Sequence, residues 1–196
     1  MPFDLAHSLS NKHLIPQPSD LALHPPESYL YIQDGLIISC AVLYALCYFF
    51  YAIRTYRDRV CAGPVEYLIG TMAYEIWYAS IMTSSRVEFA GFAVWFCCDV
   101  AFALVAIFSA YEKGTRARRV VTFLVGVPVA VAGFKWVCER WPDELEEVTA
   151  YWTGWLLELP IGWGSLGLLL WREDTKGQSL EIWYVSRFPV VFLAVT

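Results

Sequence analysis

The sequence holds three carboxylic acids inside long apolar stretches: Glu75, Asp99 and Glu158. A charged side chain at the centre of a bilayer costs at least about 2.5–3.5 kcal/mol on insertion scales, so such residues usually face a protein interior and carry function. Burial in apolar surroundings disfavours the charged form of a carboxyl group, and a second carboxyl nearby adds to this effect. A neutral carboxylic acid can donate a proton, so the three residues suit acid catalysis.

Each acid also has a structural interpretation. Glu75 could be a packing residue, Asp99 could only hydrogen-bond a neighbouring helix, and Glu158 could cap backbone groups freed near Pro160. Farther along the chain, Arg187 could hold one of the acids ionised, or could extend its guanidinium to the membrane interface. The sequence favours neither reading of this arginine.

Aromatic side chains accompany the acids. Tyr74, Trp77 and Tyr78 flank Glu75, and Tyr78 lies one helical turn from Tyr74. Aromatic faces stabilise cations, including carbocations on a cyclising chain, although ordinary packing is the more common use of such residues. The candidate pocket residues are Tyr74, Trp77, Tyr78, Trp95 and Trp183.

The elements that must position these groups are membrane helices. The chain has 196 residues, of which 58% are hydrophobic and 17% charged, against about 45–50% apolar and about 25% charged in soluble domains. We expect a polar, Pro-rich tail over residues 1–34 and a transmembrane domain over 35–196. The predicted fold class is all-α, a polytopic membrane helix bundle with about six spans, the last truncated. The predicted spans are Gly35–Ile53, Val65–Met82, Phe89–Ser109, Val120–Cys138, Val148–Trp171 and Leu180–Thr196.

Charges between the spans predict the topology. Arg and Lys gather in the first, third and fifth connections, whereas the tail and the fourth connection are mainly acidic. The positive-inside rule then puts the basic connections in the cytosol and the N-terminus on the other side. In this topology each acid lies roughly ten residues, or roughly 15 Å, from the non-cytosolic end of its span. The three acids could therefore converge on one cavity near the midplane.

Several function classes are disfavoured. The net charge is −5 with no basic tract, so we expect no nucleic-acid partner. The six cysteines show no CxxC pattern and the three histidines lie in the tail, so we expect no metal site. The sequence also lacks a Walker loop, a GxSxG elbow, an HExxH motif and an aspartate cluster for magnesium. We therefore expect no cofactor, and the predicted partners are the lipid bilayer and a small hydrophobic substrate.

Two stretches resemble the small fungal membrane-bound terpene cyclases of meroterpenoid and indole-diterpene pathways. Gly70–Tyr78 resembles the Ala-Trp-Glu-x-x-Tyr helix of that family. Gly177–Ser179, Trp183 and Ser186–Phe188 resemble its Gly-x-Ser … Trp … Ser-Arg-Phe block. The resemblance runs from about Pro64 to Phe188, close to two thirds of the chain.

This resemblance implies a seven-span protein of the endoplasmic reticulum that protonates a terminal epoxide on a prenylated aromatic or indole substrate. The family's first essential acid maps onto Glu75. Tyr74 replaces the usual Trp, and Thr71 stands where many members have Asn. The family's second essential acid lies on a last helix beyond the Ser-Arg-Phe block. Either Asp99 or Glu158 takes its role here, or the protein is a shortened form with altered chemistry or none.

The leading hypothesis is an integral membrane terpene cyclase of secondary-metabolite biosynthesis, which could associate with an upstream epoxidase and prenyltransferase. Glu75 would be the general acid, assisted by Asp99, and Glu158 would be a possible second acid or base. One alternative is a membrane epoxide hydrolase or ether-forming cyclase acting on a polyketide epoxide. Another is a non-enzymatic or truncated membrane protein.

Overall fold

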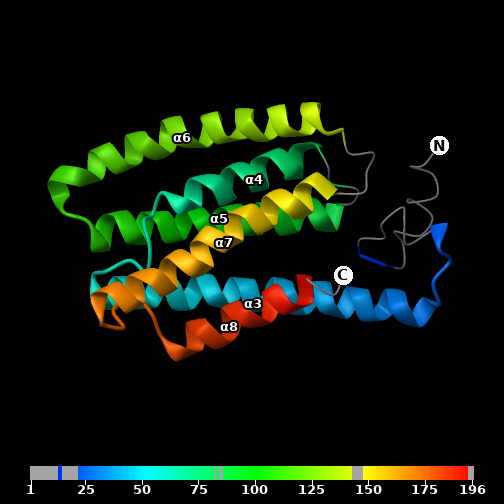
Figure 1. Cartoon of the computed structure of the whole chain (residues 1–196), viewed down its shortest axis with the longest axis horizontal. Coiled ribbons are helices and arrows are strands. Elements are labelled where there is room, and N and C mark those ends of the chain that lie inside the picture. Colours follow the sequence, from blue (N-terminus) through cyan, green and yellow to red (C-terminus); the bar gives the residue numbers. More distant parts are fainter. Residues whose placement is uncertain (1–12, 15–21, 82, 84–85, 143–147, 194–196) are drawn as a thin grey trace.

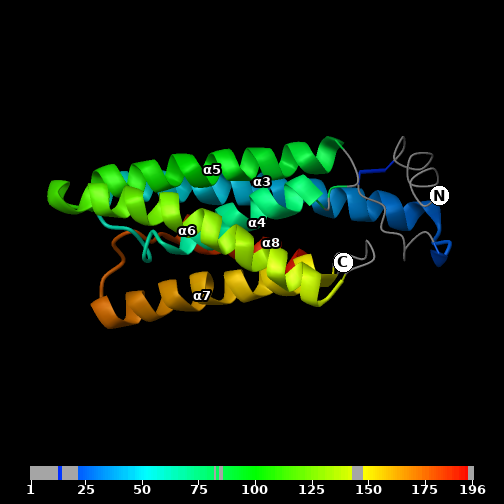
Figure 2. The same ribbon diagram turned by 90° about the horizontal axis from the view of Figure 1, so that it is seen from above.

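The computed structural model describes residues 13–14, 22–81, 83, 86–142 and 148–193, with side chains described as far as Ser186. These residues form long α-helices and no β-strand. The helices are α3 (Glu27–Asp58), α4 (Tyr67–Ile81), α5 (Arg86–Ala110), α6 (Lys113–Arg140), α7 (Val148–Arg172) and α8 (Leu180–Leu193). Figures 1 and 2 show them side by side along the long axis of the molecule. The predicted all-α bundle is confirmed.

The helices match the predicted spans closely, and the two largest differences are at N-terminal ends. The helix of the first predicted span, α3, begins at Glu27 rather than Gly35, directly after Pro26, and α6 begins at Lys113 rather than Val120. Hydropathy marks only the apolar part of a helix, whereas polar residues with good helix propensity extend it beyond that part. The last residues of the predicted sixth span, 194–196, lie outside the described residues.

The surface of the bundle suits a lipid environment. Three helices, α3, α5 and α6, are long and apolar enough to cross a membrane. Of the others, α7 has 25 residues, whereas α4 and α8 have 15 and 14. Large apolar side chains point outward along the helices, as Leu124, Trp163 and Leu170 do at 70%, 68% and 68% exposure. These features are those of an integral membrane protein, with about six spans plausible.

The centre of the bundle is α4, which packs against α5, α6 and α7, while α3 packs against α5 and α8. Two glycines allow the close approach. A Cβ added at Gly70 would lie 2.5 Å from Cδ2 of Leu157 on α7, and one at Gly126 of α6 would lie 2.8 Å from Cδ1 of Ile69. Small residues let membrane helices pack backbone to backbone. The helix that carries Glu75 is thus enclosed by three neighbours.

The three connections that are rich in arginine and lysine lie at the same end of the bundle (Figure 1). The α3–α4, α5–α6 and α7–α8 connections, which hold most of the basic residues, are all at one end of the bundle (Figure 1). We call this the basic end. It is the end that the positive-inside rule assigns to the cytosol.

Part of the predicted tail contacts the other end of α3. His13 is buried, with Nδ1 2.9 Å from Oδ2 of Asp34, and the backbone N–H of Leu14 donates to Oδ1 of the same carboxylate at 2.8 Å. The His13 ring also packs against Tyr31, with ring centroids 4.9 Å apart. This segment is therefore attached to the first turns of α3.

Candidate active site in the helix bundle

Glu75 lies in the middle of α4 and is 5% exposed. It shares the buried face of this helix with Thr71, one turn earlier, and with Tyr78. Its Oε2 atom is buried and has no hydrogen-bond partner in the described part of the chain. Buried polar atoms in folded proteins are rarely left unpaired. The Glu75 carboxyl therefore has capacity for a further partner.

Asp99 lies on α5 beside Glu75 and is fully buried. The hydroxyl of Thr71 donates a hydrogen bond to its Oδ2 atom. Because Thr71 and Glu75 are one turn apart on α4, this bond places the two carboxyls within electrostatic range of each other. Tyr48 of α3 lies near both acids. Asp99 thus bonds to a neighbouring helix, as its structural interpretation expected, and also lies next to Glu75.

Glu158 lies half-buried on α7, which continues as a helix through Pro160. Its Oε1 atom accepts a hydrogen bond from the hydroxyl of Tyr44 on α3. Asp99 lies within its electrostatic range. The partner of Glu158 among the described residues is thus a side chain on another helix and not the backbone near Pro160.

These contacts bring together residues of α3, α4, α5 and α7. We call the group the acid cluster; it consists of Glu75, Asp99, Glu158, Tyr44, Tyr48 and Thr71. In the described part of the chain, none of the three acids pairs with an arginine or lysine. Asp99 and Glu158 accept from hydroxyl groups, and Asp99 lies within electrostatic range of both other acids, an arrangement suited to holding a proton.

Aromatic rings form a continuous row beside the acid cluster. Ring centroids are 4.5 Å apart for Tyr74 and Tyr78, 6.1 Å for Tyr74 and Phe92, 5.8 Å for Phe92 and Trp95, and 5.7 Å for Trp95 and Tyr44. The row therefore connects α4 to α3 through α5. Three of the predicted pocket residues, Tyr74, Tyr78 and Trp95, belong to it.

The other predicted residues lie elsewhere. The indole N–H of Trp77 donates to Sγ of Cys138 on α6, with 3.2 Å between nitrogen and sulfur. Trp183 is half-buried on α8, whose neighbour is α3. Arg187 belongs to α8, but its side chain lies outside the described residues.

Sequence reasoning missed Tyr44 and Tyr48, which supply hydroxyl groups to the acid cluster. Their four-residue spacing on an otherwise apolar helix is a signal, since residues i and i+4 share one helix face. The structure describes no group of three or more His, Cys, Asp or Glu side chains arranged to hold a metal ion.

The fold and the site define an all-helical integral membrane protein with buried carboxyls beside a row of aromatic rings. Such an arrangement agrees with the resemblance of two sequence motifs to membrane-bound terpene cyclases. A sequence model of the Pyr4-like transmembrane terpene cyclases matches residues 19–196. The chain belongs to this family.

Curated relatives agree with the assignment. The chain is 27% identical to the Pyr4-family terpene cyclase mfmH of Annulohypoxylon moriforme over 187 residues, which cover 93% of this chain and 77% of the relative. It is 25% identical to asnovolin H synthase nvfL of Aspergillus novofumigatus, over 84% and 69% of the two chains. It is 30% identical to terpene cyclase ausL of Aspergillus calidoustus, over 82% and 67%. No solved structure matches the chain.

Proposed function

We propose that this membrane terpene cyclase protonates the terminal epoxide of a prenylated precursor and drives cationic ring closure, with Glu75 as the general acid. The observation that carries the proposal is the buried Glu75 carboxyl, whose Oε2 atom lacks a partner while Asp99 lies beside it. A positioned acid of this kind contributes about 10²–10⁴-fold to rate.

The proposed reaction is an isomerisation, in which the substrate gains one proton and later loses one. Glu75 gives its proton to the epoxide oxygen, the adjacent C–O bond breaks, and the oxygen becomes a hydroxyl. Internal alkenes then attack the carbocation in turn, each forming a C–C bond and passing the positive charge onward. Loss of a proton ends the cascade, so the product has the mass of the substrate.

The remaining carboxyls have proposed roles in moving protons. Asp99, held by Thr71, is placed to assist Glu75 or to restore its proton. Glu158, held by Tyr44, is a candidate acceptor for the proton lost at the end. These roles require that the carboxyls lie near one another, and the pairs Glu75–Asp99 and Asp99–Glu158 are each within electrostatic range.

The row of aromatic rings supports the proposal in a second way. Tyr74, Tyr78 and Trp95 lie on the two helices that carry Glu75 and Asp99. Their faces would stabilise positive charge as it moves along the chain. An apolar surrounding also keeps water from capturing the cation early.

The biological setting is part of the proposal. Two of the fungal relatives are named terpene cyclases and the third is named an asnovolin H synthase. We expect this protein in the endoplasmic reticulum with a lumenal N-terminus, where an upstream epoxidase and prenyltransferase would supply its substrate. Trp183 as a pocket residue and Arg187 as an orienting group or counter-ion stay predictions.

The test is turnover by microsomes that contain the full chain. The substrates are an epoxy-farnesyl aromatic compound, an epoxy-geranylgeranyl indole and a polyketide epoxide, and mass spectrometry reads the products. A prenyl isomer of unchanged mass would support the proposal, provided that microsomes with Glu75→Gln do not form it. A product heavier by one water would identify a hydrolase, and no turnover of any substrate would contradict the proposal.

A further inference from the structure

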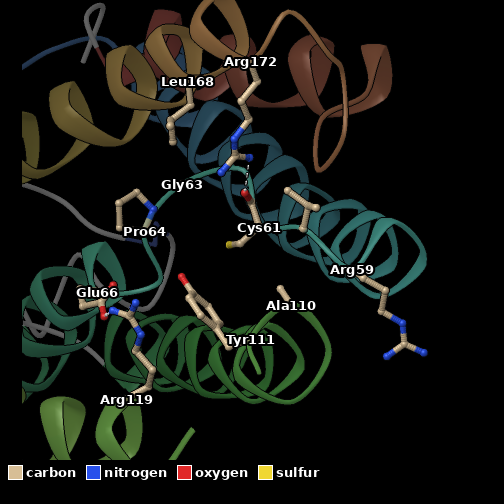
Figure 3. Close-up of a pocket in the computed structure, with 11 residues that line it drawn as sticks. Arg59, Cys61, Gly63, Pro64, Glu66, Ala110, Tyr111, Arg119, Leu168 and Arg172 are labelled. Carbon is tan, nitrogen blue, oxygen red and sulfur yellow. Dashed lines mark hydrogen bonds and ion pairs between the residues drawn. The ribbon is translucent and has the colours of Figure 1, made fainter. Parts of the chain in front are cut away.

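A cavity of about 350 Å³ lies at the basic end of the bundle, distinct from the acid cluster. It is formed where α3, α5 and α7 end and where α4 and α6 begin (Figure 3). Its polar lining includes Arg119, Arg172, Tyr111 and Glu66. We call it the arginine pocket. Its size is that of small-molecule sites, which span about 300–1,000 Å³.

Arg119 lines this pocket, where its guanidinium is held by two neighbours. One guanidinium nitrogen, Nη1, is paired with the Glu66 carboxylate, and the guanidinium stacks 4.6 Å above the ring centroid of Tyr111. Its Nε atom is buried without a hydrogen-bond partner in the described residues. Buried donors are rarely left unpaired, so an acceptor that reaches Nε would stabilise this side chain.

Arg172 and Tyr111 add further donors. Nη1 of Arg172 donates to the carbonyl oxygen of Cys61 at 3.2 Å, which uses one of the five N–H groups of the guanidinium. The Tyr111 oxygen accepts from the backbone N–H of Val65 at 3.3 Å. Burial raises the pKa of Tyr111, so its hydroxyl keeps a hydrogen to donate at neutral pH. The guanidinium of Arg59 instead points away from these groups (Figure 3). It lies over the Tyr56 ring, 4.8 Å from the ring centroid.

The rest of the lining is apolar and the pocket adjoins the lipid-facing surface. Leu168, Pro64 and Ala110 form apolar walls. Close by on α7, Leu170 and Trp171 are 68% and 79% exposed. A ligand that fits both kinds of wall carries an anionic head and an apolar body. Basic pockets between membrane helices on the cytoplasmic side are known to bind anionic head groups.

We propose that the arginine pocket binds the phosphate head group of an anionic phospholipid, with Arg119 and Arg172 as the ligating cations and Tyr111 as a third donor. Guanidinium groups are suited to this ligand because they bind phosphate oxygens in pairs. Glu66 neutralises part of the charge of Arg119 and opposes binding. The inference does not rest on the proposed cyclisation, because binding is measured without turnover.

The test is a lipid titration of the purified full chain in neutral detergent, read by native mass spectrometry. The probes are dioleoyl phosphatidic acid, dioleoyl phosphatidylcholine and glycerol 3-phosphate. We expect one phosphatidic acid per chain, bound at least about tenfold more tightly than phosphatidylcholine. Glycerol 3-phosphate should not displace it. Equal binding of both lipids would overturn the proposal, and displacement by glycerol 3-phosphate would identify a soluble phosphate as the ligand instead.

Variants separate this pocket from general surface charge. Arg172→Gln should weaken phosphatidic acid binding about tenfold, whereas Arg118→Gln, which removes the same charge from an exposed position beside Arg119, should not change it. Glu66→Gln should strengthen binding, and this variant tests the site even if Arg172→Gln does not fold. Equal losses in Arg118→Gln and Arg172→Gln, or weaker binding by Glu66→Gln, would overturn the assignment.

Discussion

Carboxyl groups at the basic end of the bundle and those in its middle have different partners. At the basic end, Glu66 pairs with Arg119 and Asp58 pairs with Arg54, whose Nε lies 2.8 Å from Oδ2 of the carboxylate. In the middle, Asp99 accepts from Thr71 and Glu158 accepts from Tyr44. The same functional group is therefore neutralised by a cation in one region and hydrogen-bonded by a hydroxyl in the other.

The difference follows from the cost of desolvation. A pair of opposite charges near the membrane surface keeps part of its contact with water, so forming it costs little. A buried charge must be paired and hydrogen-bonded or else give up its charge. A carboxyl that faces hydroxyls and aromatic rings can act as an acid or a base. A carboxylate paired with arginine is instead held in its ionised form and does not donate a proton. We therefore expect the chemistry in the middle of the bundle, while the acids at the basic end serve charge pairing.

The largest expected effect is that of Glu75→Gln, which should lower turnover by about 10²–10⁴-fold, because the amide keeps the shape but cannot donate the proton. Product formation by microsomes measures it, and the amount of full-length chain in the membrane fraction checks insertion. The matched control is Glu112→Gln, the same change at an exposed residue before α6. Substantial product from Glu75→Gln would remove Glu75 from the role of acid.

Asp99→Asn should lower turnover by about 10- to 100-fold, because the amide oxygen can still accept from Thr71 but the amide cannot restore the proton of Glu75. A kcat comparison at saturating substrate measures the effect. Thr71→Val removes only the hydroxyl that holds Asp99 and should cost roughly 2- to 10-fold, with recovery in Thr71→Ser. An unchanged rate in Asp99→Asn would return this residue to a purely structural role.

Tyr44→Phe should lower turnover by roughly 2- to 10-fold, because it removes the hydroxyl that holds Glu158. If Glu158 takes part in proton transfer, the pH profile of turnover should also shift. Tyr29→Phe, on the same helix at a 41% exposed position, is the control and should leave both rate and profile unchanged. A rate loss with an unshifted profile would indicate that the Tyr44 hydroxyl only positions its neighbours and that Glu158 takes no part in proton transfer.

The smallest expected effect belongs to the Glu66–Arg119 pair, whose side chains are 25% and 26% exposed. A double-mutant cycle of Glu66→Gln and Arg119→Gln, read by thermal unfolding in detergent, should give a coupling of about 0.2–1 kcal/mol. Added salt should weaken it. A coupling of several kcal/mol would show that charge pairs at the basic end behave as buried ones, and the comparison between the two regions would fail.

Much of the fold was predictable because hydropathy reports it directly. The predicted span Val148–Trp171 became α7, Val148–Arg172, and Phe89–Ser109 became α5, Arg86–Ala110. Prediction was weaker at Glu27, where α3 begins before any strongly apolar residue. Glu75 could be singled out by the cost of a charge inside an apolar run, but its aromatic neighbours could not be ranked in this way. Trp77 bonds to Cys138 of α6, whereas Tyr74 belongs to the row beside the acids.

The sequence by itself determined that the chain forms membrane helices and that Glu75, Asp99 and Glu158 lie within them. The reason is that a bilayer requires long apolar segments whose backbone hydrogen bonds are made internally. Only the tertiary structure decided which hydroxyl meets which acid. Tyr44 and Glu158 are 114 positions apart in the chain and Thr71 and Asp99 are 28 apart. Such pairs depend on which helix faces touch. Side-chain packing and close approach at small residues determine these faces, and a hydropathy profile does not report either of them.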